Sequence, residues 1–181
     1  MHGTGHSPLQ EPSAWVLRFA ALIPAGGTVL DLACGSGRHA RLLASMGLRV
    51  EAVDRDADAI AALAQVPGVQ ARCADIEAGS WPYTGVRFAA IVVTNYLHRP
   101  LFPALRAALG PGGLLVYETF ARGNERYGRP SNPQFLLEPG ELLQACAGLR
   151  VIAYEDVRVD VPKPALVQRI CAIAADAVPG W

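Results

Sequence analysis

Lysine and net charge are what this sequence most lacks. Lys163 is the only lysine among 16 basic residues, and these are balanced by 16 acidic residues. A chain of zero net charge has no overall attraction to nucleic acid or to an anionic membrane surface. No apolar run approaches the roughly 20 residues of a membrane-spanning helix, and the first residues show no basic-then-apolar leader. We therefore expect no nucleic-acid partner, no membrane partner and a cytoplasmic location.

Closely spaced cysteines are absent as well. The four cysteines stand far apart with no C-x-x-C pair: Cys34, Cys73, Cys146 and Cys171. Each has apolar or small neighbours, which is typical of a free thiol packed in the core of a protein from a reducing compartment. Because no His, Cys, Asp or Glu cluster has the spacing of metal ligands, no metal is expected.

The chain has the length and the apolar content of one domain. Of its 181 residues, 51% are hydrophobic, and a chain of this size buries about 70% of its unfolded surface. Residues 1–12 show no periodicity, so we expect a flexible N-terminal arm there. Residues 13–181 are expected to form a single domain.

Short apolar runs alternate with helical patterns through most of this domain. Strands are expected at 28–32, 49–54, 69–73, 88–94 and 114–119, and helices at 13–23, 37–46, 57–65 and 101–109. Such β-α alternation predicts a parallel sheet with right-handed crossovers. A last helix is expected at 139–147, and the runs 151–161 and 165–174 predict an antiparallel pair with the first of them at the sheet edge.

A glycine turn follows the first expected strand. Gly35 and Gly37 allow a ligand to approach the backbone, and the next helix directs its N-terminal N–H groups toward the turn. The spacing Gly35-x-Gly37-x-x-Ala40 also fits the loose dinucleotide fingerprint, so a nicotinamide or flavin enzyme is an alternative. That alternative usually needs a second nucleotide-binding half or a substrate domain, which this pattern of elements does not provide.

Aspartates mark the first three expected strands. Asp31 lies in the first strand, Asp54 ends the second, and Asp75 follows the third. Carboxyl ends of parallel strands meet at one edge of a sheet, which is where open α/β proteins bind ligands. Aspartate at a strand end is also a common turn former or helix cap, and this reading stays open for each residue.

Five segments together resemble the class I S-adenosylmethionine (SAM)-dependent methyltransferases. They are the turn Asp31-Leu32-Ala33-Cys34-Gly35-Ser36-Gly37, the acid Asp54, the pair Asp75-Ile76, the segment 94–98 and the turn 109–113. The resemblance implies a Rossmann-like α/β fold: a seven-stranded, mostly parallel sheet of order 3-2-1-4-5-7-6, with strand 7 antiparallel and helices on both faces. Among small members, the chain is loosely similar to the tellurite-resistance and thiol-type methyltransferases.

The resemblance also implies a cofactor site for SAM, with S-adenosyl-L-homocysteine (SAH) as the product. Asp54 would accept the ribose hydroxyls, Asp75 the adenine amino group, and Asp31 would favour the ammonium. The cofactor-binding candidates are Asp31, Ala33, Cys34, Gly35, Gly37, Asp54, Arg55, Asp75, Ile76 and Asn95. Ala33 replaces a family glycine, which is tolerable if its φ is negative.

The acceptor side is less well marked. Tyr96 and His98 leave the fourth strand and are the catalytic candidates, with His98 orienting or deprotonating the acceptor. Residues 122–133 are expected to form an acceptor-side loop, although a solvated surface loop is an equal alternative. The substrate candidates are Glu118, Arg122, Asn124, Arg126 and Tyr127.

Methyl transfer to a small-molecule acceptor by in-line displacement is the function these features favour. A non-catalytic SAM-binding regulatory or partner protein is the main alternative. A macromolecule methyltransferase and an NAD-binding oxidoreductase are less favoured, because the chain shows no basic stripe with aromatics and no second nucleotide-binding half. The oligomeric state is left open.

Overall fold

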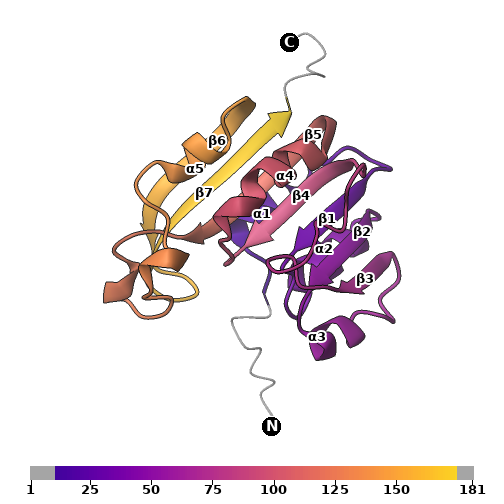
Figure 1. Cartoon of the computed structure of the whole chain (residues 1–181), viewed down its shortest axis with the longest axis horizontal. Helices are drawn as coiled ribbons and strands as arrows, with labels where there is room; N and C mark the ends of the chain where they lie inside the picture. Colours follow the sequence, from indigo (N-terminus) through magenta and orange to yellow (C-terminus); the bar gives the residue numbers. More distant parts are fainter. Residues whose placement is uncertain (1–10, 175–181) are drawn as a thin grey trace.

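Seven strands form one sheet in the order β3-β2-β1-β4-β5-β7-β6 (Figure 1). A computed structural model describes residues 11–174, and the first ten residues of the expected flexible arm lie outside that range. The strands are β1 Thr28–Leu32, β2 Arg49–Asp54, β3 Val69–Cys73, β4 Phe88–Thr94, β5 Leu109–Phe120, β6 Leu149–Val159 and β7 Ala165–Ala174. Strands β1 to β5 are parallel, and β7 runs antiparallel to both β5 and β6. The predicted fold class and strand order are confirmed.

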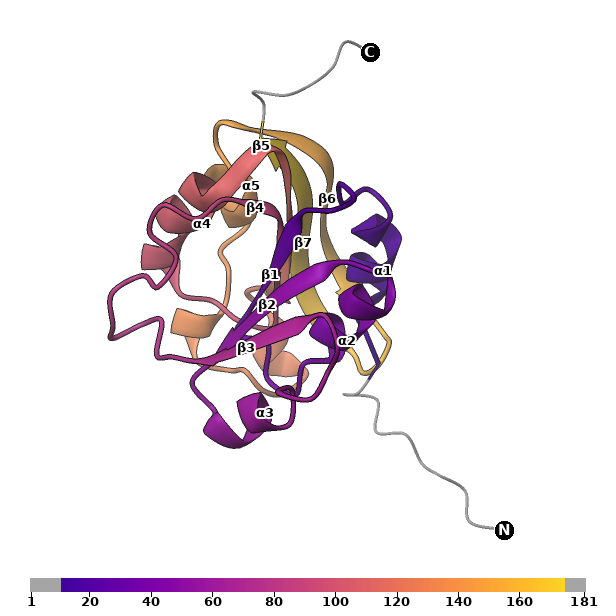
Figure 2. The same cartoon turned by 90° about the vertical axis from the view of Figure 1, so that its right-hand side faces the viewer.

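Helices cover both faces of the sheet (Figure 2). They are α1 Ala14–Ala20, α2 Arg38–Ser45, α3 Ala57–Ala61, α4 Phe102–Ala108 and α5 Glu141–Ala145, with short 3₁₀ turns η2 Arg99–Leu101, η3 Asn124–Arg126 and η4 Pro133–Phe135. Buried residues of α1, α2 and α3 belong to one apolar cluster, and those of α4 and α5 belong to another. Within residues 11–174, no helix is long and apolar enough to cross a membrane.

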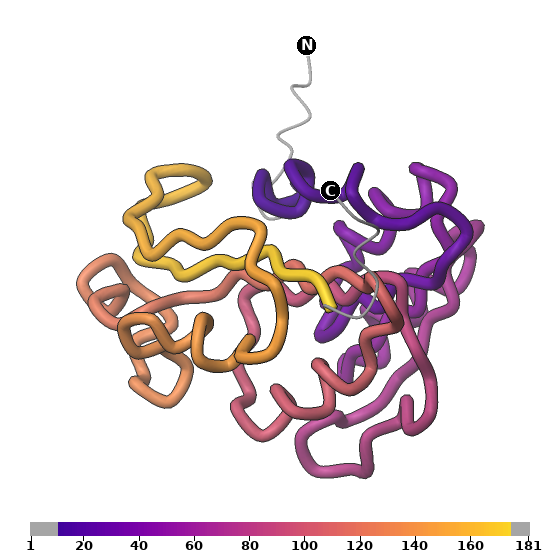
Figure 3. Tube along the Cα trace, turned by 90° about the horizontal axis from the view of Figure 1, so that it is seen from above, coloured from indigo at the N-terminus to yellow at the C-terminus, as the bar shows by residue number. Residues whose placement is uncertain are grey.

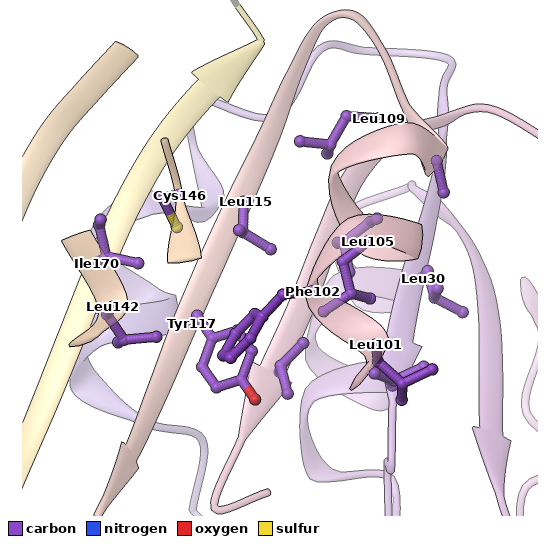
Figure 4. Packing of buried hydrophobic residues seen from close by; sticks show 14 of the residues in the cluster. Leu30, Leu101, Phe102, Leu105, Leu109, Leu115, Tyr117, Leu142, Cys146 and Ile170 are labelled. Carbon is purple, nitrogen blue, oxygen red and sulfur yellow. The ribbon is translucent and has the colours of Figure 1, made fainter. Parts of the chain in front are cut away.

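The cluster under α4 packs directly onto the central strands (Figure 4). Phe102 and Leu105 face the sheet because they lie three positions apart on one side of the helix. The Phe102 ring lies 5.6 Å from the ring of Tyr117 on β5. The Tyr117 hydroxyl donates to the backbone oxygen of Tyr96 at 2.8 Å. This contact anchors the chain where it leaves β4.

On the other face, α1 is attached to the sheet by Trp15. Its indole Nε1 donates to the backbone oxygen of Ile170 at 3.1 Å, and its ring packs edge-on against Phe19 at 4.8 Å. Ser13 caps the helix, since its side chain accepts from the backbone N–H of Trp15. The start of α1 is therefore set close to the carboxyl ends of the parallel strands.

Several element ends differ from the expected ones. The helices expected at 13–23 and 57–65 end at Ala20 and Ala61, because the chain continues in tight i to i+3 turns such as Ile23 N–H to Ala20 O. Strand β5 begins at residue 109 rather than 114, and residues 110–113 bulge out between the pairs Phe88–Leu109 and Ala90–Leu114. A side chain at Gly113 would lie 2.9 Å from the Phe88 oxygen. The glycines thus permit a bulge that no hydrophobic pattern predicts.

The cysteines are only partly as expected. All four are free thiols, and Cys34, Cys146 and Cys171 are buried. Cys73 is exposed on β3, so its prediction as a core residue is wrong. The reason is that β3 is an edge strand of the sheet, with fewer neighbours to cover it.

The expected loop after β5 is a folded excursion (Figure 3). We call residues 121–137 the excursion. Its two ends lie side by side, because Ala121 and Leu137 form a parallel bridge. Inside the excursion, the Asn124 side chain donates to the Pro130 oxygen at 3.0 Å and accepts from the Leu166 backbone N–H at 3.2 Å. The excursion is therefore held against the β6–β7 hairpin at the carboxyl end of β5.

Candidate functional site

The turn after β1 is built from left-handed residues. Gly35 and Gly37 have φ values of 51° and 74°, and a side chain at Gly37 would lie 2.4 Å from the Leu63 Cδ2 atom. Ala33 has a φ of 52°, so the condition of a negative φ, under which alanine would be tolerable there, is not met. A left-handed alanine costs roughly 1–2 kcal/mol. The surrounding turn maintains this conformation, for example through the Cys34 N–H, which donates to the Val53 oxygen at 3.0 Å.

Asp54 joins the end of β2 to this turn. Its Oδ2 accepts from the Gly35 backbone N–H at 2.8 Å, and its Oδ1 accepts from the Asp56 backbone N–H at 3.0 Å. An ionised carboxylate offers about four lone-pair sites, so two bonds leave room for further donors. The side chain is held in place and still able to accept hydroxyl groups of a ligand.

Asp75 has a mixed role. Its Oδ1 accepts from the backbone N–H groups of Glu77 and Ala78 at 2.9 and 3.1 Å. These bonds lower the pKa of Asp75 and keep it ionised. These bonds are typical of an aspartate that forms a turn, which is the alternative left open for Asp75 in the sequence. The residue also lines the cavity described below.

Asp31 is a buried carboxylate. It is 1% exposed, and within residues 11–174 its Oδ2 has no hydrogen-bond partner. Burial raises the pKa of Asp31 from 3.8 to about 7, against smaller lowering effects of the Ala40 backbone N–H and the Arg38 charge. An unpaired buried carboxylate is costly, so this atom is suited to a cationic or hydrogen-bonding group of a ligand.

A cavity of about 410 Å³ opens at the carboxyl ends of the parallel strands. Its lining comprises Ala33, Asp54, Arg55, Ala74, Asp75, Ile76, Glu77, Asn95, Tyr96, Leu97, Thr119, Phe120, Pro130 and Phe135. Six predicted cofactor residues are thus brought together: Ala33, Asp54, Arg55, Asp75, Ile76 and Asn95. The other four, Asp31, Cys34, Gly35 and Gly37, lie in the adjoining strand and turn without lining the cavity.

Several cavity residues were missed by the sequence reasoning. Ala74, Glu77 and Leu97 are immediate neighbours of predicted residues, so their positions beside strand ends were available as a signal. Thr119 and Phe120 end β5 and could have been found by the same rule. Pro130 falls within the loop 122–133 that was expected on the acceptor side, but it was not named as a candidate. Phe135 carries no such signal, because only the folding of the excursion brings it to the cavity.

Tyr96 lines the cavity and carries a buried hydroxyl group. This oxygen is buried and has no hydrogen-bond partner within the described range. Burial, followed by the charge of the nearby Glu77 carboxylate, raises the pKa of Tyr96 well above its ordinary value. Glu77 lies close enough to affect the pKa without making a well-formed hydrogen bond. Leaving a buried hydroxyl unpaired costs about 1–3 kcal/mol, which favours a ligand group as its partner.

His98 lies beside the cavity rather than in its lining. It occupies the N-cap position of η2 but makes no side-chain capping bond. Its Nδ1 lies 3.9 Å from the Glu77 Oε2. His98 therefore contacts Glu77, which lines the cavity, but His98 itself is not one of the lining residues.

Glu118 points toward the opposite face of the sheet from Tyr117. Its Oε1 accepts from the Ser13 hydroxyl at 2.7 Å, and its Oε2 pairs with Arg169 at 3.3 Å. The Ser13 backbone N–H donates to the His39 Nε2 at 3.0 Å. Since burial lowers the pKa of His39 to about 3, this imidazole is neutral and able to accept. Glu118 thus joins β5, β7 and the start of α1.

The predicted substrate residues of the excursion do not line the cavity. Asn124 is 1% exposed and braces the excursion from inside. Arg122 pairs with Glu138 at 2.8 Å. Arg126 is exposed, and Tyr127 lies on the outer surface with the Arg158 guanidinium 5.6 Å from its ring centre.

The residues at this edge fit a nucleoside cofactor that carries a cation. The acids Asp54 and Asp75 stand at one cavity with the apolar Ile76, and the Asp31 Oδ2 lacks a partner beside the same turn. The turn at Gly35 leaves open space where a side chain would project. Within the described part of the chain, no group of three or more His, Cys, Asp or Glu side chains is placed to hold a metal ion.

Comparisons with known proteins agree with this geometry. A family model described as a methyltransferase domain matches residues 6–147, well over half of the chain. No curated protein matches the sequence.

Three solved structures share the fold. TehB from Haemophilus influenzae superposes with a TM-score of 0.76 at 19% identity, covering 90% of this chain and 62% of TehB, so the chain spans less than two thirds of that protein. The glycopeptide N-methyltransferase MtfA, complexed with SAH, gives 0.65 at 19% identity, covering 91% and 90%. Coclaurine N-methyltransferase, bound to N-methylheliamine and SAH, gives 0.69 at 12% identity, covering 96% and 75%.

Proposed function

The chain belongs to a methyltransferase domain family, and we propose that it is a SAM-dependent methyltransferase that methylates a small-molecule acceptor in the cavity at the carboxyl ends of the parallel strands. One observation carries the proposal. The acids that end β2 and follow β3, Asp54 and Asp75, share a single cavity with Tyr96 and Thr119 from the ends of β4 and β5. This arrangement supports adjoining places for a nucleoside and a second molecule. The solved neighbours that hold SAH, with N-methylheliamine in one case, support this division.

We propose that the cofactor is held by three acids and one apolar side chain. Asp54 accepts the ribose hydroxyls, because charge-assisted bonds to a carboxylate are stronger than neutral ones. Asp75 accepts from the adenine amino group, with Ile76 against the ring. Asp31 stabilises the ammonium through its unpartnered Oδ2. When bound, SAM supplies a methyl group activated by the sulfonium to which it is attached.

The protein promotes methyl transfer mainly by positioning the acceptor and the methyl group, and less by acid–base catalysis. Holding acceptor and methyl in line can contribute about 7–11 kcal/mol, and a base is needed only for an acceptor that arrives protonated. We propose that Tyr96 contacts the acceptor, and that the excursion of residues 121–137 excludes water through Pro130 and Phe135. We also propose that no metal takes part, because an already charged leaving group needs no Lewis acid. Turnover should then survive addition of a chelator.

For His98 we propose a positioning role through Glu77. Its Nδ1 lies 3.9 Å from the Glu77 Oε2 and outside the lining. We expect His98→Ala to lower turnover, and His98→Asn, which keeps a donor, to restore part of it with a flatter pH profile. Unchanged turnover and an unchanged pH profile in His98→Ala would remove His98 from the mechanism. If His98→Asn restored none of the turnover lost in His98→Ala, the role of His98 would instead be proton transfer.

Calorimetry with SAM and SAH tests the cofactor assignment. Asp54→Asn should weaken binding of both by about tenfold or more, since a hydrogen bond to a charged group contributes about 1.5–3 kcal/mol. Asp56→Asn is the matched control, because Asp56 caps α3 two residues away without lining the cavity. If neither compound bound the wild-type protein, the proposal would fail. Binding without turnover across an acceptor screen would favour a non-catalytic SAM-binding protein.

A further inference from the structure

We propose that the acceptor is an uncharged aromatic molecule bound beside Phe120 and Phe135, an inference that rests on the proposed function. The part of the cavity away from Asp54 and Asp75 is lined by the side chains of Thr119, Phe120, Pro130 and Phe135, together with Tyr96. Three of these five residues, Phe120, Pro130 and Phe135, are apolar, and Thr119 and Tyr96 each carry one hydroxyl group.

Two phenylalanines come to this end of the cavity from separate elements. Phe120 is the last residue of β5, and Phe135 ends η4 after the excursion has turned back. Phe135 stays 50% exposed although it is a large apolar side chain. Its ring is therefore available to a ligand. Aromatic rings prefer offset-stacked or edge-to-face partners, so a flat ring fits between such side chains better than an aliphatic chain.

Charge around the cavity disfavours an anionic acceptor. Three acids line it, Asp54, Asp75 and Glu77, against the single cation Arg55 among the residues of its lining in the described structure. Backbone N–H groups lower the pKa of Asp75, so its negative charge persists. A carboxylate or phosphate entering this space would meet like charge.

The arginines of the excursion do not compensate for these acids. Arg122 is paired with Glu138 at 2.8 Å, and neither Arg122 nor Arg126 lines the cavity. Asn124 is a third polar substrate candidate, but its side chain bonds to the Pro130 oxygen and the Leu166 N–H instead. The contacts of these substrate candidates therefore give no geometric support for an anionic acceptor.

The Tyr96 hydroxyl defines the polar part of the acceptor. Tyr96 is a lining residue of the cavity, and its hydroxyl oxygen is buried with no hydrogen-bond partner within residues 11–174. A neutral hydroxyl or amine on an aromatic ring would pair with it and would also be a chemically reasonable methyl acceptor. Apolar walls with one or a few placed polar groups are the usual construction of small-molecule sites.

Equilibrium binding to the SAH-loaded protein tests this inference without relying on turnover. The probes are naphthol, naphthoate and the saturated bicyclic alcohol decalol, measured by calorimetry. We expect naphthol to bind about tenfold more tightly than either of the others. Phe135→Ala should weaken naphthol binding about tenfold, whereas Tyr127→Ala, an exposed aromatic of the same excursion outside the cavity, should leave it unchanged.

The outcomes separate this inference from the proposed function. If SAH does not bind, the proposed function fails and this inference fails with it. If SAH binds but naphthoate is preferred, and Arg122→Ala removes that preference, the acceptor is anionic and the inference is overturned. If decalol bound as tightly as naphthol, the inference that the acceptor is aromatic would be overturned. Equal losses in the Phe135 and Tyr127 variants would show that neither loss reports on the cavity, which also refutes the assignment.

Discussion

The stability of the free protein should depend on pH through Asp31. Burial raises the pKa of this carboxyl from 3.8 to about 7 in the folded state. Between these two values the folded protein keeps a proton that the unfolded chain has released. The folded state binds more protons there, so the free energy of unfolding falls as pH rises through this window.

The magnitude follows from the two pKa values. Each pH unit in the window removes about 1.4 kcal/mol, so the contribution of Asp31 falls by about 4 kcal/mol between 3.8 and about 7. His39 acts in the opposite direction: burial lowers its pKa from 6.5 to about 3, so it favours the folded state as pH rises. The pH dependence of the free energy of unfolding of the wild type therefore contains both contributions. The difference in this free energy between wild type and Asp31→Asn isolates the contribution of Asp31.

Urea unfolding of the two proteins at about pH 5 and about pH 8 measures this difference, which should change by about 3 kcal/mol because about two pH units of the window lie between these conditions. Asp31→Asn should gain stability relative to wild type at the higher pH, because asparagine carries no charge to bury. Asp56→Asn, which changes an exposed capping aspartate, should show no such pH-dependent difference. SAM should bind the wild type more tightly as pH rises through about 7, since a cation beside Asp31 favours its ionised form. A wild-type-minus-variant difference that is the same at both pH values would refute the reasoning.

Three further changes test the turn and the excursion. Ala33→Gly should raise the free energy of unfolding by about 1 kcal/mol, because φ is 52° there; no gain in urea unfolding would contradict the strain. Gly37→Ala should destabilise the fold and weaken SAH binding in calorimetry, since φ is 74° and the new atom would lie 2.4 Å from Leu63 Cδ2; wild-type values would show that the turn adapts. Asn124→Ala should cost about 1–3 kcal/mol and speed proteolysis within residues 121–137, because it removes the bonds to Pro130 and to the Leu166 N–H; unchanged cleavage would contradict the bracing role.

Much of the fold follows from local patterns. The strands β2, β3, β4 and β7 have the bounds that their apolar runs predict, because polar residues, glycine or proline flank these runs at one or both ends. Helix ends were less predictable. The last turns of α1 and α3 tighten according to how the helix meets the sheet, and the residues alone do not specify that contact.

The cofactor side of the site was also predictable in part. Parallel strands end at the same edge, so Asp54 and Asp75 had to approach each other once the strand order was known. The φ of Ala33 was not predictable, because alanine has an intrinsic preference for negative φ that only the surrounding turn overcomes.

By itself, the sequence determined the β-α alternation, the glycine turn and the strand-end acids, since each depends on residues close together in the chain. The tertiary structure was needed to find the rest of the cavity lining and the partners of Glu118. Phe135 lines the cavity only because residues 121–137 return to their own starting point, and Glu118 is committed to Ser13, 105 positions earlier. Such contacts depend on how distant segments pack, and the same polar or aromatic residue would suit a solvated surface equally well.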